Sequence, residues 1–362
     1  MGFLPRRAQI RLFVSLPVPC RRLGLLLIVV CGLSVVVDAQ NADYISPVPV
    51  FSGSAGFITT VNGGKAELAP VVAPVVLVPF GSKWLIEAKG EFEGDFEQED
   101  GSFRGPVEKE VPYLQADYIA NRFVTFTAGR FLTPFGLYNE RLYPIWIRNL
   151  QSTPLIFPLG AGSSDGAMLR GGFELKPGLN VNYATYFSTL STVKKLDSDR
   201  LMGSRFGIFL PTPRLEFGFS VQHLLQEERT NALGFHFEWQ PRSMPMDLRA
   251  EYARSALGSG YWAETAYRLS DVELWHGALR RLQLVARMQQ FVPKANVDED
   301  EFEEYALPDV NTRQAEFGIN YFLKDGLKAT ASYGRQFSSD GNANIWTVGL
   351  AYRFAFPMGS SQ

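Results

Sequence analysis

Few side chains in this sequence are arranged for bond-making chemistry. Residues 162–166 (Gly-Ser-Ser-Asp-Gly) match the pattern of a nucleophilic serine, which needs a strand before it and a helix after it. Here a loop leads into a strand-like segment instead. The three histidines, His223, His236 and His276, have no serine partner at cross-strand spacing. We therefore expect no catalytic residue and no enzymatic activity.

Metal and cofactor chemistry is equally poorly supported. The acidic run at residues 298–304, followed by Asp309, could hold divalent cations that bridge lipopolysaccharide, but it lacks the spacing of a calcium loop and fits a solvated loop better. No glycine-rich phosphate loop, dinucleotide fingerprint or metal triad is present. We expect no metal and no cofactor.

The remaining candidates are charged residues that could sort ions by electrostatics. They are Lys89, Glu91, Arg130 and Arg170 in strand-like segments, and Glu140, Arg141 and Arg148 within the long connection 132–164. Charges that line a narrow aqueous path set which ions pass through it. What matters is therefore which elements bring these charges to one place.

Strand-like alternation dominates the chain. In residues 344–356, Trp346, Val348 and Leu350 share one side, while Thr347 and Gly349 share the other. In water, such an apolar face on a terminal edge strand would promote aggregation. In a closed membrane barrel, the apolar face contacts lipid and the polar face contacts the water-filled lumen. Aromatic residues near strand ends, including Trp84, Trp262 and Trp346, are expected to form belts at the bilayer surface.

The alternation predicts an all-β fold, a transmembrane antiparallel β-barrel of about 16 strands. The strands are expected near 53–62, 69–79, 83–96, 112–120, 122–131, 165–175, 178–189, 202–210, 214–224, 231–239, 246–254, 260–269, 281–291, 312–323, 326–337 and 344–356. Their connections alternate between long and tight, as in outer-membrane barrels. Connection 270–280 is the exception, being long on the tight side.

The third connection on the long side, 132–164, is unusually apolar for a loop. It is expected to fold into the barrel and constrict the lumen. Its charges would then face the wall, which makes Arg130, Glu140, Arg141, Arg148, Lys89, Glu91 and Arg170 the candidate constriction residues. The alternatives are a loop that covers the barrel mouth and a loop that contacts another subunit.

The N-terminus has the pattern of a cleaved signal peptide over residues 1–39, with a basic segment, an apolar run and small residues before Gln40. Residues 40–52 are expected to form a periplasmic segment, 53–356 the barrel and 357–362 a tail. Cleavage removes both cysteines, so no disulfide or thiol site is expected. It also leaves 30 basic and 36 acidic residues, a net charge of −6 that argues against a nucleic-acid partner.

Several segments resemble a known family. Residues 129–136 (Gly-Arg-Phe-Leu-Thr-Pro-Phe-Gly), Asn139 to Leu142, and 165–171 are similar to phosphate-selective porins of the O/P type. The resemblance implies a sixteen-stranded barrel, usually a homotrimer, that passes small hydrophilic solutes. The C-terminal residues Thr347, Gly349, Tyr352, Phe354 and Phe356 also resemble the signal that outer-membrane barrels present to the barrel-assembly machinery.

The expected function is passive diffusion of small hydrophilic solutes or ions across the outer membrane of a Gram-negative-type bacterium, in contact with its lipid and lipopolysaccharide. Phosphate selectivity is not expected, because basic residues on the lumen side are interleaved with acidic ones and predict weak selectivity. One alternative is a non-conducting barrel with an adhesion or envelope-structural role. Another is a loop-closed barrel for hydrophobic solutes, with Phe131, Phe135, Trp146 and Phe157 pointing inward.

Overall fold

The computed structural model describes residues 48–358 except 100, 161, 192, 194–195, 197, 227–229, 274, 296, 298 and 325. The predicted signal peptide, residues 40–47 and the last four residues of the predicted tail lie outside the described part. Within it, no helix is long and apolar enough to cross a membrane.

Strands make up nearly all of the described chain. They are β1 (Val50–Asn62), β2 (Lys65–Phe80), β3 (Trp84–Gly94), β4 (Phe96–Glu99), β5 (Ser102–Arg104), β6 (Val107–Asn121), β7 (Val124–Leu132), β8 (Ser163–Lys176), β9 (Leu179–Thr189), β10 (Leu201–Leu210), β11 (Leu215–Leu224), β12 (Asn231–Trp239), β13 (Met246–Arg254), β14 (Gly258–Arg268), β15 (Leu282–Pro293), β16 (Thr312–Lys324), β17 (Leu327–Ser338) and β18 (Gly341–Pro357). Sixteen of these match the sixteen predicted strands. The first begins at Val50, inside the segment predicted to precede the barrel.

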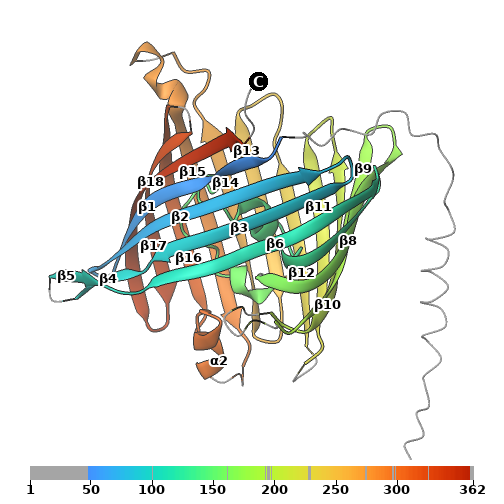
Figure 1. Ribbon diagram of the computed structural model, residues 1–362. Coiled ribbons are helices and arrows are strands. Elements are labelled where there is room, and N and C mark those ends of the chain that lie inside the picture. Colours follow the sequence, from blue (N-terminus) through green and yellow to red (C-terminus); the bar gives the residue numbers. More distant parts are fainter. Residues whose placement is uncertain are drawn as a thin grey trace, which may run out of the picture. The chain divides into compact units, whose positions relative to one another are not determined.

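The sheet closes on itself into an antiparallel barrel (Figure 1). Each strand of the wall pairs with the next, and β18 returns to pair with β1 from Val50↔Pro357 to Asn62↔Ile345. Closure removes the exposed sheet edges that a membrane cannot tolerate. The predicted sixteen-stranded barrel is confirmed.

The two extra strands, β4 and β5, form a hairpin that extends the wall at one end. They pair through Gln98↔Phe103 around a turn at Gly101, whose φ is +79°. The sequence predicted a connection over 97–111, because charged residues there obscure the alternation. Paired strands that extend beyond the apolar band have water on both sides, so they need no apolar face.

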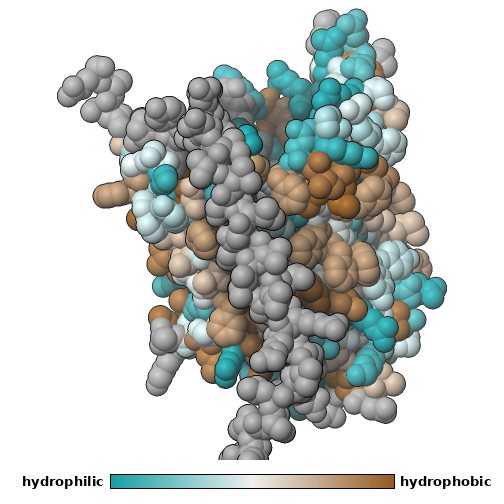
Figure 2. Space-filling model, turned by 90° about the vertical axis from the view of Figure 1, so that its right-hand side faces the viewer, coloured by the Kyte–Doolittle hydropathy of each residue, from teal (hydrophilic) through white to brown (hydrophobic). Residues whose placement is uncertain are grey.

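The two faces of the wall differ as the alternation predicts. Along β18, Trp346 is 56% exposed on the outer face, whereas Thr347 is 4% exposed on the lumen side. Figure 2 shows one outer face of the molecule, where hydrophobic residues gather across the middle and hydrophilic residues toward both ends. This is the distribution that a bilayer requires.

The two ends of the barrel carry different connections (Figure 1). One end holds the long connection with α2 (Glu299–Glu304) and the loop between β7 and β8. The other end has tight turns apart from the β14–β15 connection, which contains the 3-10 helix η3 (Trp275–Arg281), at the predicted exception. The β1–β2 and β17–β18 turns on the long-loop side are nevertheless tight.

The main hydrophobic core lies inside the barrel, between the wall and the β7–β8 connection. This connection contains a π-helical turn, η1 (Tyr138–Leu142), and a 3-10 turn, η2 (Phe157–Leu159). Its side chains Leu137, Tyr138, Leu142 and Ile156 are buried against Trp262 of β14. Trp262 is only 1% exposed, so the expectation that it joins an aromatic belt is wrong. It supports the loop from the lumen side.

Candidate pore constriction

The connection between β7 and β8, residues 133–162, is called the inner loop below. It enters the lumen through a bend at Gly136, whose φ is +65°. The Gly136 N–H donates to Ser220 Oγ at 3.0 Å, and the N–H groups of Leu137 and Tyr138 donate to Glu251 Oε2 at 3.1 and 3.3 Å. Wall side chains thus satisfy the backbone donors at the start of η1, which otherwise lack partners.

We expect Gly136→Ala to loosen this bend. A Cβ at Gly136 would lie 1.8 Å from Glu251 Oε1, and the positive φ disfavours any side chain. The expected result is a loss of roughly 1–3 kcal/mol in the free energy of unfolding, typical of added strain in a packed core, with noisier single-channel currents. Urea unfolding and bilayer recordings measure the two effects. Gly63→Ala is the control, since its positive-φ turn has open space around it. Equal behaviour of the two variants would contradict a specific role for the bend.

The tip of η1 is held by opposite charges on β10, β11 and β12. Glu140 pairs with Arg205, while Arg141 lies 2.6 Å from Glu216 Oε1 and 3.2 Å from Glu238 Oε2. Burial alone lowers the pKa of Arg141, but its hydrogen bond to Glu216 and the nearby carboxylates raise it, so the guanidinium stays charged. Glu140 and Arg141 therefore anchor the loop.

A second group of contacts anchors the middle of the inner loop to β14, β15 and β16. Asn149 Nδ2 donates to Glu264 Oε1 at 2.8 Å, and Ser152 Oγ donates to Glu316 Oε2 at 2.6 Å. Arg287 joins the two halves, because it lies 2.7 Å from Glu264 Oε2 and donates to the Ser152 carbonyl at 2.8 Å. Charged side chains of the wall therefore fix the positions of polar groups in the middle of the inner loop.

Lys328 of β17 caps the turn at residues 144–148. Its ammonium donates to the carbonyl oxygens of Trp146 at 3.0 Å and Arg148 at 2.5 Å, and the side chain is almost fully buried. Nearby, the Arg353 guanidinium of β18 lies 5.6 Å from the Trp146 ring centroid. The inner loop therefore contacts the wall from β10 round to β18.

These contacts separate the charges of the lumen. The sequence predicted a wall of interleaved acids and bases, but the bases of β10, β15 and β17 are bound to the loop or to carboxylates beside it. The opposite wall, formed by β2, β3 and β6, keeps its acids facing an aqueous cavity. The lining of this cavity is therefore mainly acidic, whereas the wall elsewhere keeps acids and bases side by side, as in the pairs of Arg170 with Asp117 and Arg249 with Glu238.

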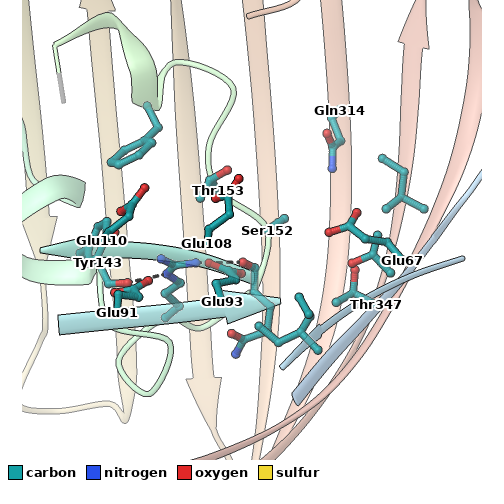
Figure 3. A pocket seen from close by; sticks show the side chains of 17 residues that line it. Glu67, Glu91, Glu93, Glu108, Glu110, Tyr143, Ser152, Thr153, Gln314 and Thr347 are labelled. Carbon is teal, nitrogen blue, oxygen red and sulfur yellow. Dashed lines mark hydrogen bonds between the residues drawn. The ribbon is translucent and has the colours of Figure 1, made fainter. Parts of the chain in front are cut away.

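The cavity between the inner loop and this wall has a volume of about 450 Å³. Five glutamates line it, with Arg148 as its one basic lining residue. We call these five the acidic wall, and they are Glu67, Glu91, Glu93, Glu108 and Glu110. Figure 3 shows Glu91, Glu93, Glu108 and Glu110 gathered on neighbouring strands, with Glu67 and Thr347 across the gap and Ser152 and Thr153 on the loop behind them.

Four of these carboxylates form two cross-strand pairs of like charge. Glu91 lies opposite Glu110, and Glu93 lies opposite Glu108, in the β3–β6 register. Directly opposed like charges destabilise a sheet. Among the contacts of the described residues, only Glu91 has an ion-pair partner in this group, Lys89 at 2.5 Å. The five carboxylates of the acidic wall therefore outnumber the basic groups that contact them or line the cavity.

Lys89 and Arg148 converge on Tyr143 of the inner loop. The Lys89 ammonium lies 4.1 Å from the Tyr143 ring centroid, and Arg148 Nε donates to the Tyr143 carbonyl at 2.8 Å. Burial and the nearby carboxylates of Glu91 and Glu110 raise the pKa of Tyr143, so its phenol stays neutral. Of the predicted constriction residues, Lys89, Glu91 and Arg148 are thus brought together.

Two other predicted residues lie elsewhere. Arg170 faces the lumen beside Asp117, at 3.2 Å, away from the acidic wall. Arg130 pairs with Leu114 and Asp165 in register, and Leu114 is exposed on the outer face, so Arg130 belongs to the outer row. It forms an ion pair with Asp165 at 3.0 Å. The register between β6 and β7 decides whether Arg130 faces the lumen or the outer surface. The sequence alone does not determine that register to within one residue.

Glu108 and Glu110 fall within the predicted connection 97–111, so they were not predicted as lining residues. The alternation of Glu108, Lys109 and Glu110 was the signal in the sequence that could have identified them.

A barrel for hydrophobic solutes would need its apolar loop residues to point into the cavity. Phe131 and Phe135 are instead fully packed, whereas Phe157 lines the cavity. At the C-terminus, Tyr352 and Phe356 face outward, as their side of the strand predicts.

No protein-family model and no curated protein matches the sequence. Solved structures do match. OprB of Pseudomonas putida has a TM-score of 0.57 at 8% identity, over 85% of this chain and 93% of that one. The fold is that of an outer-membrane porin.

Two further porin-fold structures agree. The outer-membrane channel DcaP of Acinetobacter baumannii has a TM-score of 0.54 at 11% identity, over 87% of this chain and all of that one. The anion-selective porin from Comamonas acidovorans has 0.53 at 10% identity, over 84% and 98%. Identities this low establish the porin fold alone.

Proposed function

We propose that this protein is a passive outer-membrane channel that favours small hydrophilic cations over anions. The observation that carries the proposal is the acidic wall, which faces a cavity that is also lined by residues of the inner loop. Lumen charges of one sign attract counter-ions and repel co-ions, because the low-dielectric wall focuses their field.

The electrostatic energy between these carboxylates and a passing ion is large enough to select cations over anions. Two unit charges 4 Å apart interact by about 1 kcal/mol even in bulk water, and more strongly beside protein. Glu67, Glu93, Glu108 and Glu110 form no ion pair among the described residues, and Arg148 offsets one charge of the group. A preference of several-fold for cations at the constriction follows from these numbers.

Phosphate selectivity has little physical support. A phosphate path needs accessible bases, whereas Arg205, Arg287 and Lys328 are engaged by carboxylates or by the loop backbone. The fold does not decide the matter, since an anion-selective porin shares it. The homotrimer, the contacts with lipid and lipopolysaccharide, and recognition of the C-terminal strand by the assembly machinery belong to the same proposal.

The test is the reversal potential of the refolded mature protein in planar bilayers under a KCl gradient. We expect the reversal potential of the native protein to have the sign that indicates a preference for potassium over chloride. In the variant Glu93→Gln/Glu108→Gln, the ratio of potassium to chloride permeability should fall severalfold toward unity. Glu174→Gln is the matched control, because Glu174 lies at the tight-turn end of β8 and accepts from the Gly178 N–H. Anion preference in the native protein would overturn the proposal. Electrical silence from a correctly folded barrel would favour the non-conducting alternative.

A further inference from the structure

We infer that the cavity at the acidic wall binds extended organic polyammonium compounds, meaning alkyl chains with two or more ammonium groups. The inference rests on the proposed cation-favouring channel and names a class of solute for it. Three independent features of the cavity support this chemistry.

The first feature is a buried acceptor without a donor. Gln151 is one of the residues that line the cavity, and it is only 7% exposed. Its Nε2 donates to the Ile145 carbonyl at 3.4 Å, but its Oε1 accepts no hydrogen bond from any described residue. Buried polar atoms are normally paired, so an unpaired one needs an explanation. An ammonium N–H supplies the missing donor.

The second feature is the way the negative charge is spread. Among the described residues, no three acidic or histidine side chains converge closely enough to hold one metal ion. Instead, the Glu91–Glu110 and Glu93–Glu108 pairs follow each other along β3 and β6. Two residues along a strand are about 7 Å apart, a spacing that an alkyl chain of three to five methylene groups bridges. Glu67 of β2 lies across the gap from these pairs. A compact ion neutralises one pair, whereas a polyammonium chain neutralises the series.

The third feature is an alkylammonium group already seated beside the cavity. Lys89 places its ammonium 2.5 Å from Glu91 Oε2 and 4.1 Å from the Tyr143 ring centroid. Carboxylate on one side and an aromatic face on the other is the usual environment for such a group. Phe157 adds apolar surface to the lining for the methylene chain. The wall thus has the elements that recognise each part of the solute.

Current block by spermidine, with butylamine as the monoamine control at equal charge concentration, tests the inference. Spermidine added on the long-loop side should reduce single-channel current saturably, and butylamine should not. We expect Glu93→Gln/Glu108→Gln to raise the half-blocking concentration at least ten-fold and Gln151→Leu to raise it severalfold. Glu174→Gln should leave it unchanged.

The outcomes separate this inference from the proposed function. If the channel prefers potassium but spermidine and butylamine block it equally, the inference is overturned and the proposed cation channel is not. General electrostatic attraction would then explain the preference and the block alike. Block unchanged in Glu93→Gln/Glu108→Gln would place the site elsewhere and also overturn it. Calorimetric titration of the refolded barrel with spermidine provides a readout that does not depend on conduction. Binding lost in the same variants supports the inference, and absence of binding to the native protein overturns it.

Discussion

Replacing the inner loop by a short Gly-Ser turn is expected to raise the single-channel conductance severalfold and to remove most of the cation preference. The two ends of the loop lie together, since the Thr133 N–H donates to the Gly162 carbonyl at 3.0 Å, so a short turn can join them. Without the loop, water fills the lumen and screens the acidic wall, while Arg205 and Lys328 lose their partners on the loop and become free to attract anions. Bilayer recordings in a salt gradient measure both quantities.

Two controls keep this result interpretable. Circular dichroism and the gel mobility of unheated samples should report a folded barrel, because the β7–β8 pairing from Thr125↔Arg170 to Leu132↔Ser163 does not involve the loop. Shortening the connection at residues 294–311, whose helix α2 lies at the same end, should leave the sign of the selectivity unchanged. A loop-free barrel with native conductance would show that the constriction lies elsewhere.

Arg287→Met is expected to cause the largest loss of stability among single substitutions in the wall. Arg287 and Glu264 are 2% and 3% exposed, with their charges 2.7 Å apart. Removing one partner leaves the other buried and unpaired, which costs about 3–5 kcal/mol. The Ser152 carbonyl also loses its donor, so the loop should loosen. Urea unfolding in lipid vesicles, followed by tryptophan fluorescence, measures the change.

The double substitution Arg287→Met/Glu264→Met distinguishes pairing from packing. Replacing both charges by apolar groups removes the unpaired charge, so most of the lost stability should return. Arg280→Met is the matched control, because its pair with Glu273 is exposed and such pairs contribute about 0–1 kcal/mol. A double variant as unstable as the single one would mean that the arginine acts through its packing alone.

The wall was predictable because membrane barrels repeat one simple rule. Alternation in segments such as 344–356 reports directly which face meets lipid, and the sixteen strands follow from it. The rule fails where lipid is absent. β4, β5 and the start of β6 extend beyond the apolar band, so the residue pattern there indicates a connection and hides Glu108 and Glu110.

The candidate site was less predictable because it depends on which charges meet across the lumen. Alternation predicts that Arg205 and Arg287 lie inside the barrel, but only the path of the inner loop shows that they are already engaged, and that Lys328 is engaged as well. Arg130 illustrates the other limit. A shift of one residue in strand register moves a side chain to the opposite face, and the sequence does not determine register to that precision.

The inner loop also constrains the order in which the molecule can fold. Its partners are far along the chain: Glu251 follows Leu137 by 114 residues, and Lys328 follows Trp146 by 182. The wall that receives the loop is complete only when the C-terminal strand has paired with the first one. Contacts between such distant segments form slowly. Closing the barrel and seating the loop should therefore occur together as the last step of folding, so that a nascent chain lacking its final strand has neither a sealed wall nor a constriction.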